Sequence, residues 1–408
     1  MLIAALDVGS SKICCFVANV NAEGGIRVVG FAQQASAGVR NGCLVDMEAA
    51  QKAILTVVSA AEEMADERID KIFVNLSGGK LQSQIHEIEV SIDGHEIADT
   101  DIRKAREKHF QIEQLEDSDL IHSLPVGYWV DGKRGIRDPR GMFGDLLGAS
   151  FHHIKSSPGP IRNLKNCLAK CHLEINKVVV SPYASGLSCL VDDEKDLGVT
   201  LVDMGGGTTT IAVFFDGQVI FSDSIPVGGL HVTSDLARGL STSLLNAERI
   251  KILYGSAVLA QSGDNDIIDI PLVGEEEHKN INHVPRSLLS GIIRPRLEET
   301  FELVRERLDI SGRGKMSGRR LVLTGGASQL HGIPELSGLV LEKQVRIGRP
   351  LKINGLAEAI SGPAFSSCAG LLRFGVEKGF RAEDHLSYDE SEIGNRITKF
   401  GHWLKENF

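Results

Sequence analysis

A glycine-rich hairpin near the middle of the chain constrains the fold more than any other feature. Residues 201–211 read LVDMGGGTTTI, in which one apolar strand reaches Asp203 and a second follows the turn. The turn is made by Gly205, Gly206, Gly207 and Thr208. These residues predict an anion site, because glycines allow φ > 0 and present bare N–H groups, and threonine adds a hydroxyl donor. A carboxylate beside a phosphate needs a cation between them, so Asp203 predicts Mg²⁺ held mainly through water. Taken alone, the stretch is equally compatible with a hairpin that binds nothing.

The same arrangement recurs at the N-terminus, where residues 2–18 give a strand, a turn and a second strand. This turn carries Asp7, Gly9, Ser10, Ser11 and Lys12. Two such hairpins predict two similar halves of the molecule that face one ligand. A third glycine motif, at 320–336, reads as a buried strand, a Gly325–Gly326 turn and a helix that starts near Ala327. Paired glycines at this place favour close approach of the backbone to a flat or phosphorylated ligand.

Length and composition bound the classes of protein to which the chain can belong. With 408 residues, 42% of them hydrophobic, it can bury at least two cores. A net charge of −10 argues against duplex nucleic acid as the principal partner. Seven cysteines without paired CxxC spacing predict buried thiols in a reducing compartment. The first apolar run contains Asp7, and no window reaches ~18 uncharged apolar residues, so we expect a cytoplasmic chain without signal peptide or membrane span.

The N-terminal order of elements favours one fold class over its main rival. Three strands, an amphipathic helix at 46–66 capped by Asp46 and a further strand at 71–78 follow one another. This is the order of one half of an actin-like fold, and a parallel-sheet mononucleotide fold is the alternative. Further helices are expected at 157–175, 228–240, 246–255, 285–311 and 365–375, with an exposed break at 192–196 and a loop at 261–284.

Residues 80–160 differ in character from the segments on either side. A helix beginning at Thr100 and short strands around a Pro- and Gly-rich turn predict a small inserted α+β subdomain. His122, His152 and His153 lie there. No carboxylate or cysteine shares their spacing, so they are expected at the surface or at an interface rather than at a metal.

The C-terminus combines an acidic segment with an amphipathic one. Residues 377–392 are acidic and poorly patterned, which predicts a flexible linker. In 393–408 an apolar stripe with Trp at its border is flanked by basic residues: Ile393, Ile397, Phe400, Trp403, Leu404 and Phe408, with Arg396, Lys399 and Lys405. A helix of about 24 Å is too short to cross a bilayer but suited to lie along an anionic one. The alternative is a helix docked on the protein's own core.

Several segments together resemble a known family. LDVGSSKI, LVDMGGGTTTI and LTGGASQLHGI resemble the two phosphate loops and the adenosine loop of the actin superfamily. Within it the chain resembles the FtsA family of bacterial cell-division proteins along nearly its whole length. GVRNGCLVDMEAAQKAI, HSLPVGYWVDGKRGIRDPRGMFG and GGLHVTSDLA are similar to segments that other actin relatives lack. The resemblance implies an α/β, actin-like two-domain ATPase fold with an inserted small α+β subdomain and a C-terminal amphipathic helix.

The resemblance also implies a division of the chain into domains. The first actin-like domain takes 1–79 and 161–192, closed by a helix at 356–376, and carries the insertion at 80–160. The second takes 193–227 and 312–355, with an upper subdomain at 228–311. The linker at 377–392 and a membrane-binding helix at 393–408 follow.

Functional residues are implied position by position. Contacts to the phosphates of ATP fall to Gly9, Ser10, Ser11, Lys12, Gly205, Gly206, Gly207 and Thr208. The magnesium water shell falls to Asp7 and Asp203, which are also the candidates for catalysis. Contacts to adenosine fall to Gly325, Gly326, Ala327, Glu248 and Lys251. Arg294 and Arg296 stand where the family receives the acidic C-terminal peptide of the tubulin-like FtsZ.

The family's role implies partners and a location. The chain is expected to self-associate into actin-like protofilaments at the cytoplasmic face of the cell membrane, at the division site. There it would bind anionic phospholipid, tether FtsZ filaments and help recruit other division proteins, with no nucleic acid partner.

One departure bears on catalysis. Where hydrolytic relatives carry Glu or Gln to orient the attacking water, this chain has Ser181. Serine is a short side chain and a poor base, so we expect a slow ATPase at most, with ATP mainly a conformational and polymerisation ligand. The alternative function is a soluble small-molecule kinase of the same superfold, which needs a positioned base and a substrate cleft and gives no reason for the amphipathic tail.

Overall fold

Two sheets of the same strand order form the framework of the molecule. The computed structural model describes residues 1–113, 119–258, 266–274 and 281–384. The first sheet has the order β11-β6-β1-β2-β3, with β19 added beside β3. Written in the same direction, the second has the order β18-β17-β12-β13-β14. Their strands are β1 (Leu2–Val8), β2 (Lys12–Val20), β3 (Ile26–Ala35), β6 (Lys71–Leu76), β11 (Glu174–Val180), β19 (Ile353–Asn354), β12 (Val199–Met204), β13 (Thr209–Phe215), β14 (Gln218–Ile225), β17 (Arg320–Thr324) and β18 (Gln344–Ile347).

The pairing directions exclude the all-parallel alternative. In each sheet the first three strands are antiparallel, β1 with β2 and β2 with β3, then β12 with β13 and β13 with β14. The next two strands add in parallel on the other side of β1 and of β12. The prediction of two similar halves is therefore confirmed at the level of topology.

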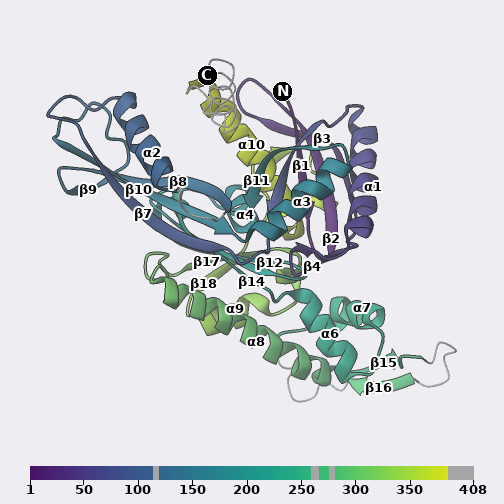
Figure 1. The fold of residues 1–408 in the computed structure, drawn as a ribbon. Coiled ribbons are helices and arrows are strands. Elements are labelled where there is room, and N and C mark those ends of the chain that lie inside the picture. The colour runs from purple at the N-terminus through teal and green to yellow at the C-terminus, as the bar shows by residue number, and fades with distance from the viewer. Residues whose placement is uncertain (114–118, 259–265, 275–280, 385–408) are drawn as a thin grey trace, which may run out of the picture.

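Alternation along β1 explains how the first sheet is covered on both faces. Ala4, Leu6 and Val8 pack with α1 (Met47–Ala65) and α3 (Pro158–Lys170), whereas Ile3 and Ala5 pack with α4 (Ser181–Cys189) and α10 (Ser366–Asp384). Figure 1 shows α1 and α3 on the outer side of this sheet. The predicted cap of α1 is confirmed, because the Asp46 side chain accepts hydrogen bonds from two backbone N–H groups of the first turn.

The second sheet carries a larger helical superstructure. Its core joins α6 (Gly229–Gly239), α7 (Leu244–Tyr254), α8 (Arg286–Ser311) and α9 (Ile333–Leu341). The loop expected at 261–284 is wrong, because β15 (Ile267–Pro271) and β16 (Ile281–Pro285) pair there as an antiparallel ribbon. Only Ile268 and Ile270 of β15 are buried, and two apolar positions gave too short an alternation to be recognised.

Two local expectations in this half also need correction. The break expected at 192–196 is the short helix α5 (Asp192–Leu197), which buries Glu194. The helix expected from Ala327 is a 3-10 turn over Gly326–Gln329, and α9 begins only at Ile333. Gly332 lies between them with φ of +79°, a left-handed conformation that separates the two helical segments.

The inserted segment forms a sheet of its own with the order β7-β10-β8-β9. Its elements are β7 (Gln82–Ser91), α2 (Asp99–Glu113), β8 (Asp119–Val130), β9 (Lys133–Ile136) and β10 (Leu146–Ser156). Figure 1 shows it as an arm to one side of the two main sheets. Thr100 lies inside α2 rather than at its start, because Asp101, one position later, accepts a hydrogen bond from the Ala98 N–H and so performs the capping.

The insertion rests on the edge strand of the second sheet. His152 shares its ring nitrogens between the Val219 carbonyl of β14, at 2.9 Å, and the Ser83 hydroxyl of β7, at 2.6 Å. Arg137 adds ion pairs to Asp196 and Asp216. His122, His152 and His153 are all buried, so the expectation of surface histidines is wrong, whereas that of an interface holds for His152 and for His122, whose ring accepts a hydrogen bond from the Val180 N–H of β11. Within the described residues, no group of three or more His, Cys, Asp or Glu side chains is placed to hold a metal ion.

The end of the chain departs from expectation where it is described. The linker expected from 377 overlaps α10, which continues to Asp384, since charged residues such as Glu and Lys are also good helix formers. The tail helix at 393–408, with all of its membrane residues, lies outside the described residues. In the described part of the chain no helix is long and apolar enough to cross a membrane. All seven cysteines are free thiols; six are buried, as predicted, and Cys43 is half-buried.

Candidate functional site

The turns of the two glycine hairpins meet and together line a cleft of about 680 Å³. All fifteen residues assigned to phosphate, magnesium and adenosine line this one cleft: Asp7, Gly9, Ser10, Ser11, Lys12, Asp203, Gly205, Gly206, Gly207, Thr208, Glu248, Lys251, Gly325, Gly326 and Ala327. They come from β1–β2, β12–β13, α7 and the turn after β17. Segments far apart in the sequence therefore meet at one site.

The two hairpin turns have the same geometry. The Gly9 N–H donates to the Lys12 carbonyl at 3.1 Å, and the Gly205 N–H donates to the Thr208 carbonyl at 2.8 Å. Gly205 to Gly207 do not adopt positive φ, so the expectation of left-handed backbone there is wrong. They are required by space instead: a Cβ on Gly206 would come within 2.6 Å of the Ser11 Cβ. The two turns thus lie in van der Waals contact with each other.

Lys12 supplies the clearest sign that the cleft takes an anion. Among the described residues its buried ammonium has no hydrogen-bond acceptor, and it lies 3.1 Å from the centre of the Phe365 ring. A buried ammonium without a hydrogen-bond acceptor is costly, even with an aromatic face beside it and the electrostatic attraction of Asp7 and Asp203. The hydroxyl of Thr210, which also lines the cleft, is buried without a partner in the described structure. Both groups fit a phosphate.

Two buried carboxylates stand at the base of the cleft. Asp7 accepts a hydrogen bond from the Asn75 side chain at 2.6 Å. Burial raises the pKa of Asp7 to about 7, with Lys12 opposing and Asp203 adding to the rise. Burial also raises the pKa of Asp203. Two carboxyls that are hard to ionise together fit a divalent cation, and Mg²⁺ is usually held by one or two carboxylates and several waters.

The residues predicted to contact adenosine are more constrained than the sequence indicates. The Lys251 ammonium donates to Glu248 at 2.7 Å, to the Thr233 hydroxyl at 2.8 Å and to the Gly229 carbonyl at 3.1 Å. It is therefore turned onto α6, and the Glu248 side chain is the more exposed of the pair, 35% against 13%. Gly325 has φ of +86°, and a Cβ there would lie 2.3 Å from Asp203 Oδ1. The turn after β17 thus abuts the Asp203 carboxylate.

Sequence reasoning missed three polar residues of the site. Asn75 bridges Asp7 and the Ser181 hydroxyl, and a polar residue inside the buried run KIFVNL was a usable signal. Ser185 and Ser367 donate to Asp203 from α4 and α10. They stand in small-residue helical segments, where no local pattern distinguishes them.

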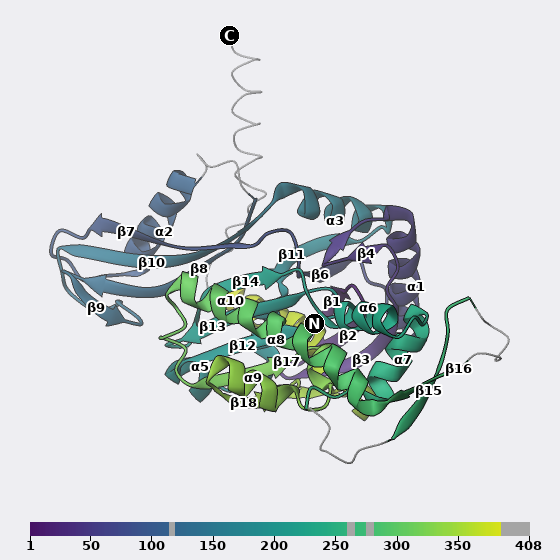
Figure 2. The same cartoon turned by 90° about the horizontal axis from the view of Figure 1, so that it is seen from below.

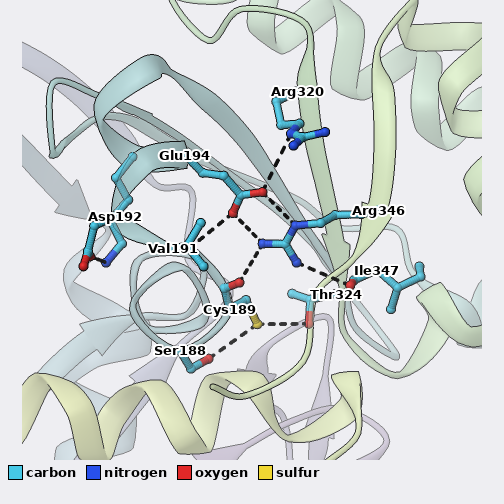
Figure 3. A network of polar contacts seen from close by, with 10 residues as sticks. Ser188, Cys189, Val191, Asp192, Glu194, Arg320, Thr324, Arg346 and Ile347 are labelled. Carbon is cyan, nitrogen blue, oxygen red and sulfur yellow. Dashed lines mark hydrogen bonds and ion pairs between the residues drawn. The ribbon is translucent and has the colours of Figure 1, made fainter. Parts of the chain in front are cut away.

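A network at the far end of α4 anchors this helix to the second sheet (Figure 3). Arg346 of β18 forms an ion pair with Glu194 of α5 and donates to the Cys189 carbonyl at the end of α4. Burial alone raises the pKa of Glu194, but Arg346 outweighs it and the pKa lies below its usual value. The Cys189 thiol reaches Thr324, the residue before Gly325. The network fixes α4 beside the cleft.

Arg294 and Arg296 lie on α8 and are not among the residues that line the cleft. Arg294 pairs with Glu298 at 2.7 Å, and Arg296 pairs with Asp235 at 2.6 Å and with Glu299. Each arginine is therefore already in an ion pair with a carboxylate of its own chain, which an acidic peptide would have to displace.

Comparison with known proteins gives consistent matches. A family model described as "Cell division protein FtsA" matches residues 200–370, and one described as "SHS2 domain inserted in FTSA" matches residues 78–155. The chain is 42% identical to cell division protein FtsA of Rhizobium meliloti, over 100% of this chain and 95% of the relative. It is 34% identical to that of Pseudomonas aeruginosa, over 92% and 90%. Identity to that of Escherichia coli K12 is 30%, over 100% and 98%.

Solved structures agree on the fold. The chain is similar to a structure of the PilM-PilN type IV pilus biogenesis complex, with a TM-score of 0.63 at 17% identity, covering 92% of this chain and 98% of that one. It is also similar to MreB5 of Spiroplasma citri bound to ADP, with a TM-score of 0.54 at 14% identity, covering 95% and 99%. Together with the matched insertion, these neighbours confirm the predicted actin-like fold with its inserted subdomain.

Proposed function

The chain belongs to the FtsA family of cell division proteins, and on this premise we propose that it is an ATP-binding, self-associating protein that tethers FtsZ to the cytoplasmic membrane. The observation that carries the nucleotide is the cleft, where both hairpins, the adenosine loop and the unpaired Lys12 ammonium converge. MreB5, a structural neighbour, was solved bound to ADP, which supports a nucleotide of this class.

Within the cleft the chain's residues take distinct roles. The N–H groups and hydroxyls of the two turns bind the phosphates, and Lys12 neutralises their charge. Asp7 and Asp203 hold the water shell of Mg²⁺, which when bound screens the phosphates from these carboxylates. Gly325 to Ala327 lie along the adenosine, and Glu248 presents an acceptor to it.

ATP serves this chain as a conformational ligand more than as a substrate. The buried Ser181 hydroxyl lies at the cleft and already accepts a hydrogen bond from Asn75, at 3.1 Å. A serine so placed is a poor base for activating water at neutral pH. We therefore propose slow hydrolysis at most, with nucleotide state governing self-association.

Attachment to membrane and FtsZ rests on other parts of the chain. The residues at 393–408 form the amphipathic pattern that suits an anionic lipid surface. Arg294 and Arg296 receive the acidic C-terminal peptide of FtsZ by exchanging their intrachain carboxylates for those of the peptide. Other division proteins assemble on the resulting layer at the division site.

The test is recruitment of FtsZ to anionic vesicles by the full chain with ATP and Mg²⁺, measured by co-sedimentation. The full chain should pellet with the vesicles and carry FtsZ with it, and a chain ending at Asp389 should do neither. Arg296→Glu should keep vesicle binding and lose FtsZ, while Arg305→Glu, an exposed arginine of the same helix, should keep both. Vesicle binding by the truncated chain, or FtsZ recruitment by Arg296→Glu, would overturn the corresponding half of the proposal.

A further inference from the structure

The two carboxylates of the cleft are held by different parts of the molecule. Asp7 of β1 is held by Asn75 of β6, the neighbouring strand of its own sheet. Asp203 of β12 instead accepts two hydroxyl hydrogen bonds on the same oxygen, Oδ2, from Ser185 at 2.5 Å and from Ser367 at 3.1 Å. Ser185 belongs to α4 and Ser367 to α10.

These donors belong to helices that cover the opposite half of the molecule. Ala184 of α4 and Cys368 of α10, next to the two serines in sequence, lie in the core beneath the first sheet. The helices cross with their backbones in contact, because a Cβ on Gly370 would lie 1.7 Å from the Ala184 carbonyl oxygen. α4 also reaches the second sheet, where a Cβ on Gly186 would strike the Phe214 ring. The helix pair therefore lies where the two halves meet: Figure 1 shows α4 between them, and Figure 2 shows α10 near the middle of the molecule.

The arrangement fixes which oxygen of Asp203 faces the cleft. Both serine hydroxyls are buried and 2.9 Å apart, and each has one proton to donate. When both protons go to Oδ2, that oxygen is occupied and Oδ1 is left on the side of Gly325, at the cleft. Hydrogen bonds to a carboxylate are among the stronger ones, so this orientation is held firmly.

We propose that Ser185 and Ser367 are positioning residues, which orient Asp203 for the hydrated cation of the nucleotide and transmit the presence of that cation to the α4–α10 helix pair. This inference rests on the proposed binding of ATP with Mg²⁺. It adds how binding of the cation at Asp203 affects the helices between the two halves: a change in the position of Asp203 acts on two serines at once, one in each helix.

Ser188 offers a matched control on the same helix. Its hydroxyl is fully buried, like that of Ser185, but it donates to the Ser185 and Ser366 carbonyls and not to Asp203. Ser188→Ala therefore removes a buried hydroxyl of α4 without touching the carboxylate. A merely structural role of Ser185 predicts that the two alanine variants behave alike.

The experiment titrates Mg²⁺ into the full chain with a fluorescent ATP analogue and records both half-saturating Mg²⁺ and the affinity for the analogue without Mg²⁺. Ser185→Ala and Ser367→Ala should each raise half-saturating Mg²⁺ about tenfold, the effect of one charge-assisted hydrogen bond, and leave the Mg²⁺-free affinity unchanged. Ser188→Ala should change neither quantity, and Ser367→Thr, which keeps a hydroxyl at this position, should respond to Mg²⁺ as the wild type does. Hydrogen exchange supplies the second readout: Mg²⁺ with the analogue should slow exchange in α4 and α10 of the wild type but not of the double alanine variant.

The outcomes separate this inference from the function on which it rests. If the wild type does not bind the analogue, the proposed nucleotide site is overturned and this inference with it. If the wild type binds with a Mg²⁺ response but Ser185→Ala and Ser367→Ala match Ser188→Ala, only the positioning role is overturned. Should Ser185→Ala fail to fold, the Ser367→Ala and Ser367→Thr pair decides alone.

Discussion

The first and second sheets repeat one topology but bring different chemistry to the cleft. The turn of the first sheet carries a cation and two hydroxyls, whereas that of the second carries three glycines and so offers mainly backbone N–H groups. The carboxylate of the first half is held from within its own sheet, and that of the second by helices lying between the halves. The repeated fold thus yields a site with two unlike sides. The first turn, with Lys12 and the hydroxyls of Ser10 and Ser11, is the charged wall, and the second, with the N–H groups of Gly205 to Gly207, is the backbone wall. Each wall can be tested separately.

The largest effect is expected on the backbone wall. Gly206→Ala places a Cβ 2.6 Å from the Ser11 Cβ, so the two turns must separate. Overpacking of this kind costs about 1–3 kcal/mol, and displacement of the N–H donors adds to it, so nucleotide affinity should fall at least 100-fold. Calorimetric titration with ATP and Mg²⁺ measures the loss. Gly291→Ala on α8, where a Cβ meets open space, is the control and should bind normally.

The buried histidines of the insertion and the buried Asp7 of the first half make opposite contributions to the pH response. Burial lowers the pKa of His152 to about 4, and the pKa values of His109 and His153 are lowered to about 4 and about 3, again mainly by burial. An unfolded histidine titrates near 6.5, so the unfolded chain binds more protons between that pH and about 4. The stability contributed by the neutral histidines is then full above pH 6.5 and falls as the pH drops through about 4, by about 3 kcal/mol for His152 alone, whereas the contribution of Asp7, whose pKa is raised to about 7, becomes more favourable as the pH falls.

Urea unfolding at pH 7.5 and at pH 5 measures this loss. His152→Gln removes one of the titrating groups, so its stability should change less between the two pH values than that of the wild type. An equal change in both proteins would mean that His152 is not neutral in the folded chain.

On the charged wall, Lys12→Met should weaken ATP binding roughly tenfold, since it removes one charge-assisted contact to phosphate. The free energy of unfolding without nucleotide should be unchanged or higher, because the variant no longer buries an ammonium that has no hydrogen-bond acceptor among the described residues. Lys251→Met is the informative contrast: this lysine has three acceptors, so its loss should lower the melting temperature. Equal melting temperatures for the two variants would contradict the difference between paired and unpaired lysines.

The smallest effect concerns how the equivalent helices begin. The Asp46 side chain accepts hydrogen bonds from two N–H groups of the first turn of α1, whereas α6 begins after Gly228, which has no side chain, and only the Gly228 N–H is bonded, to the His231 ring. Asp46→Ala should therefore cost about 1 kcal/mol of unfolding free energy, measured by urea denaturation. Glu48→Ala, which removes only an exposed ion pair of the same turn, should cost less than about 0.5 kcal/mol. If the two variants lose the same, the cap contributes nothing beyond surface charge.

The sequence predicted the parts of the site that lie in local motifs and missed those assembled by packing. Both turns, Asp7 and Asp203 stand in short strand–turn–strand patterns, so their convergence could be inferred. Ser185 and Ser367 could not, because their roles depend on how α4 and α10 cross. The glycines of the second turn were recognised for the wrong reason: close contact between the turns, rather than positive φ, requires them. The β15–β16 ribbon was missed because so few of its residues are buried.

The central claim is that the two hairpins form a single nucleotide site, and calorimetric titration of ATP with Mg²⁺ into the full chain tests it most directly. We predict one site per chain in the wild type, and weakened binding whether the change is made in the first turn, by Lys12→Met, or in the second, by Gly206→Ala. Two sites per chain, or unchanged binding after a substitution in either turn, would contradict the claim.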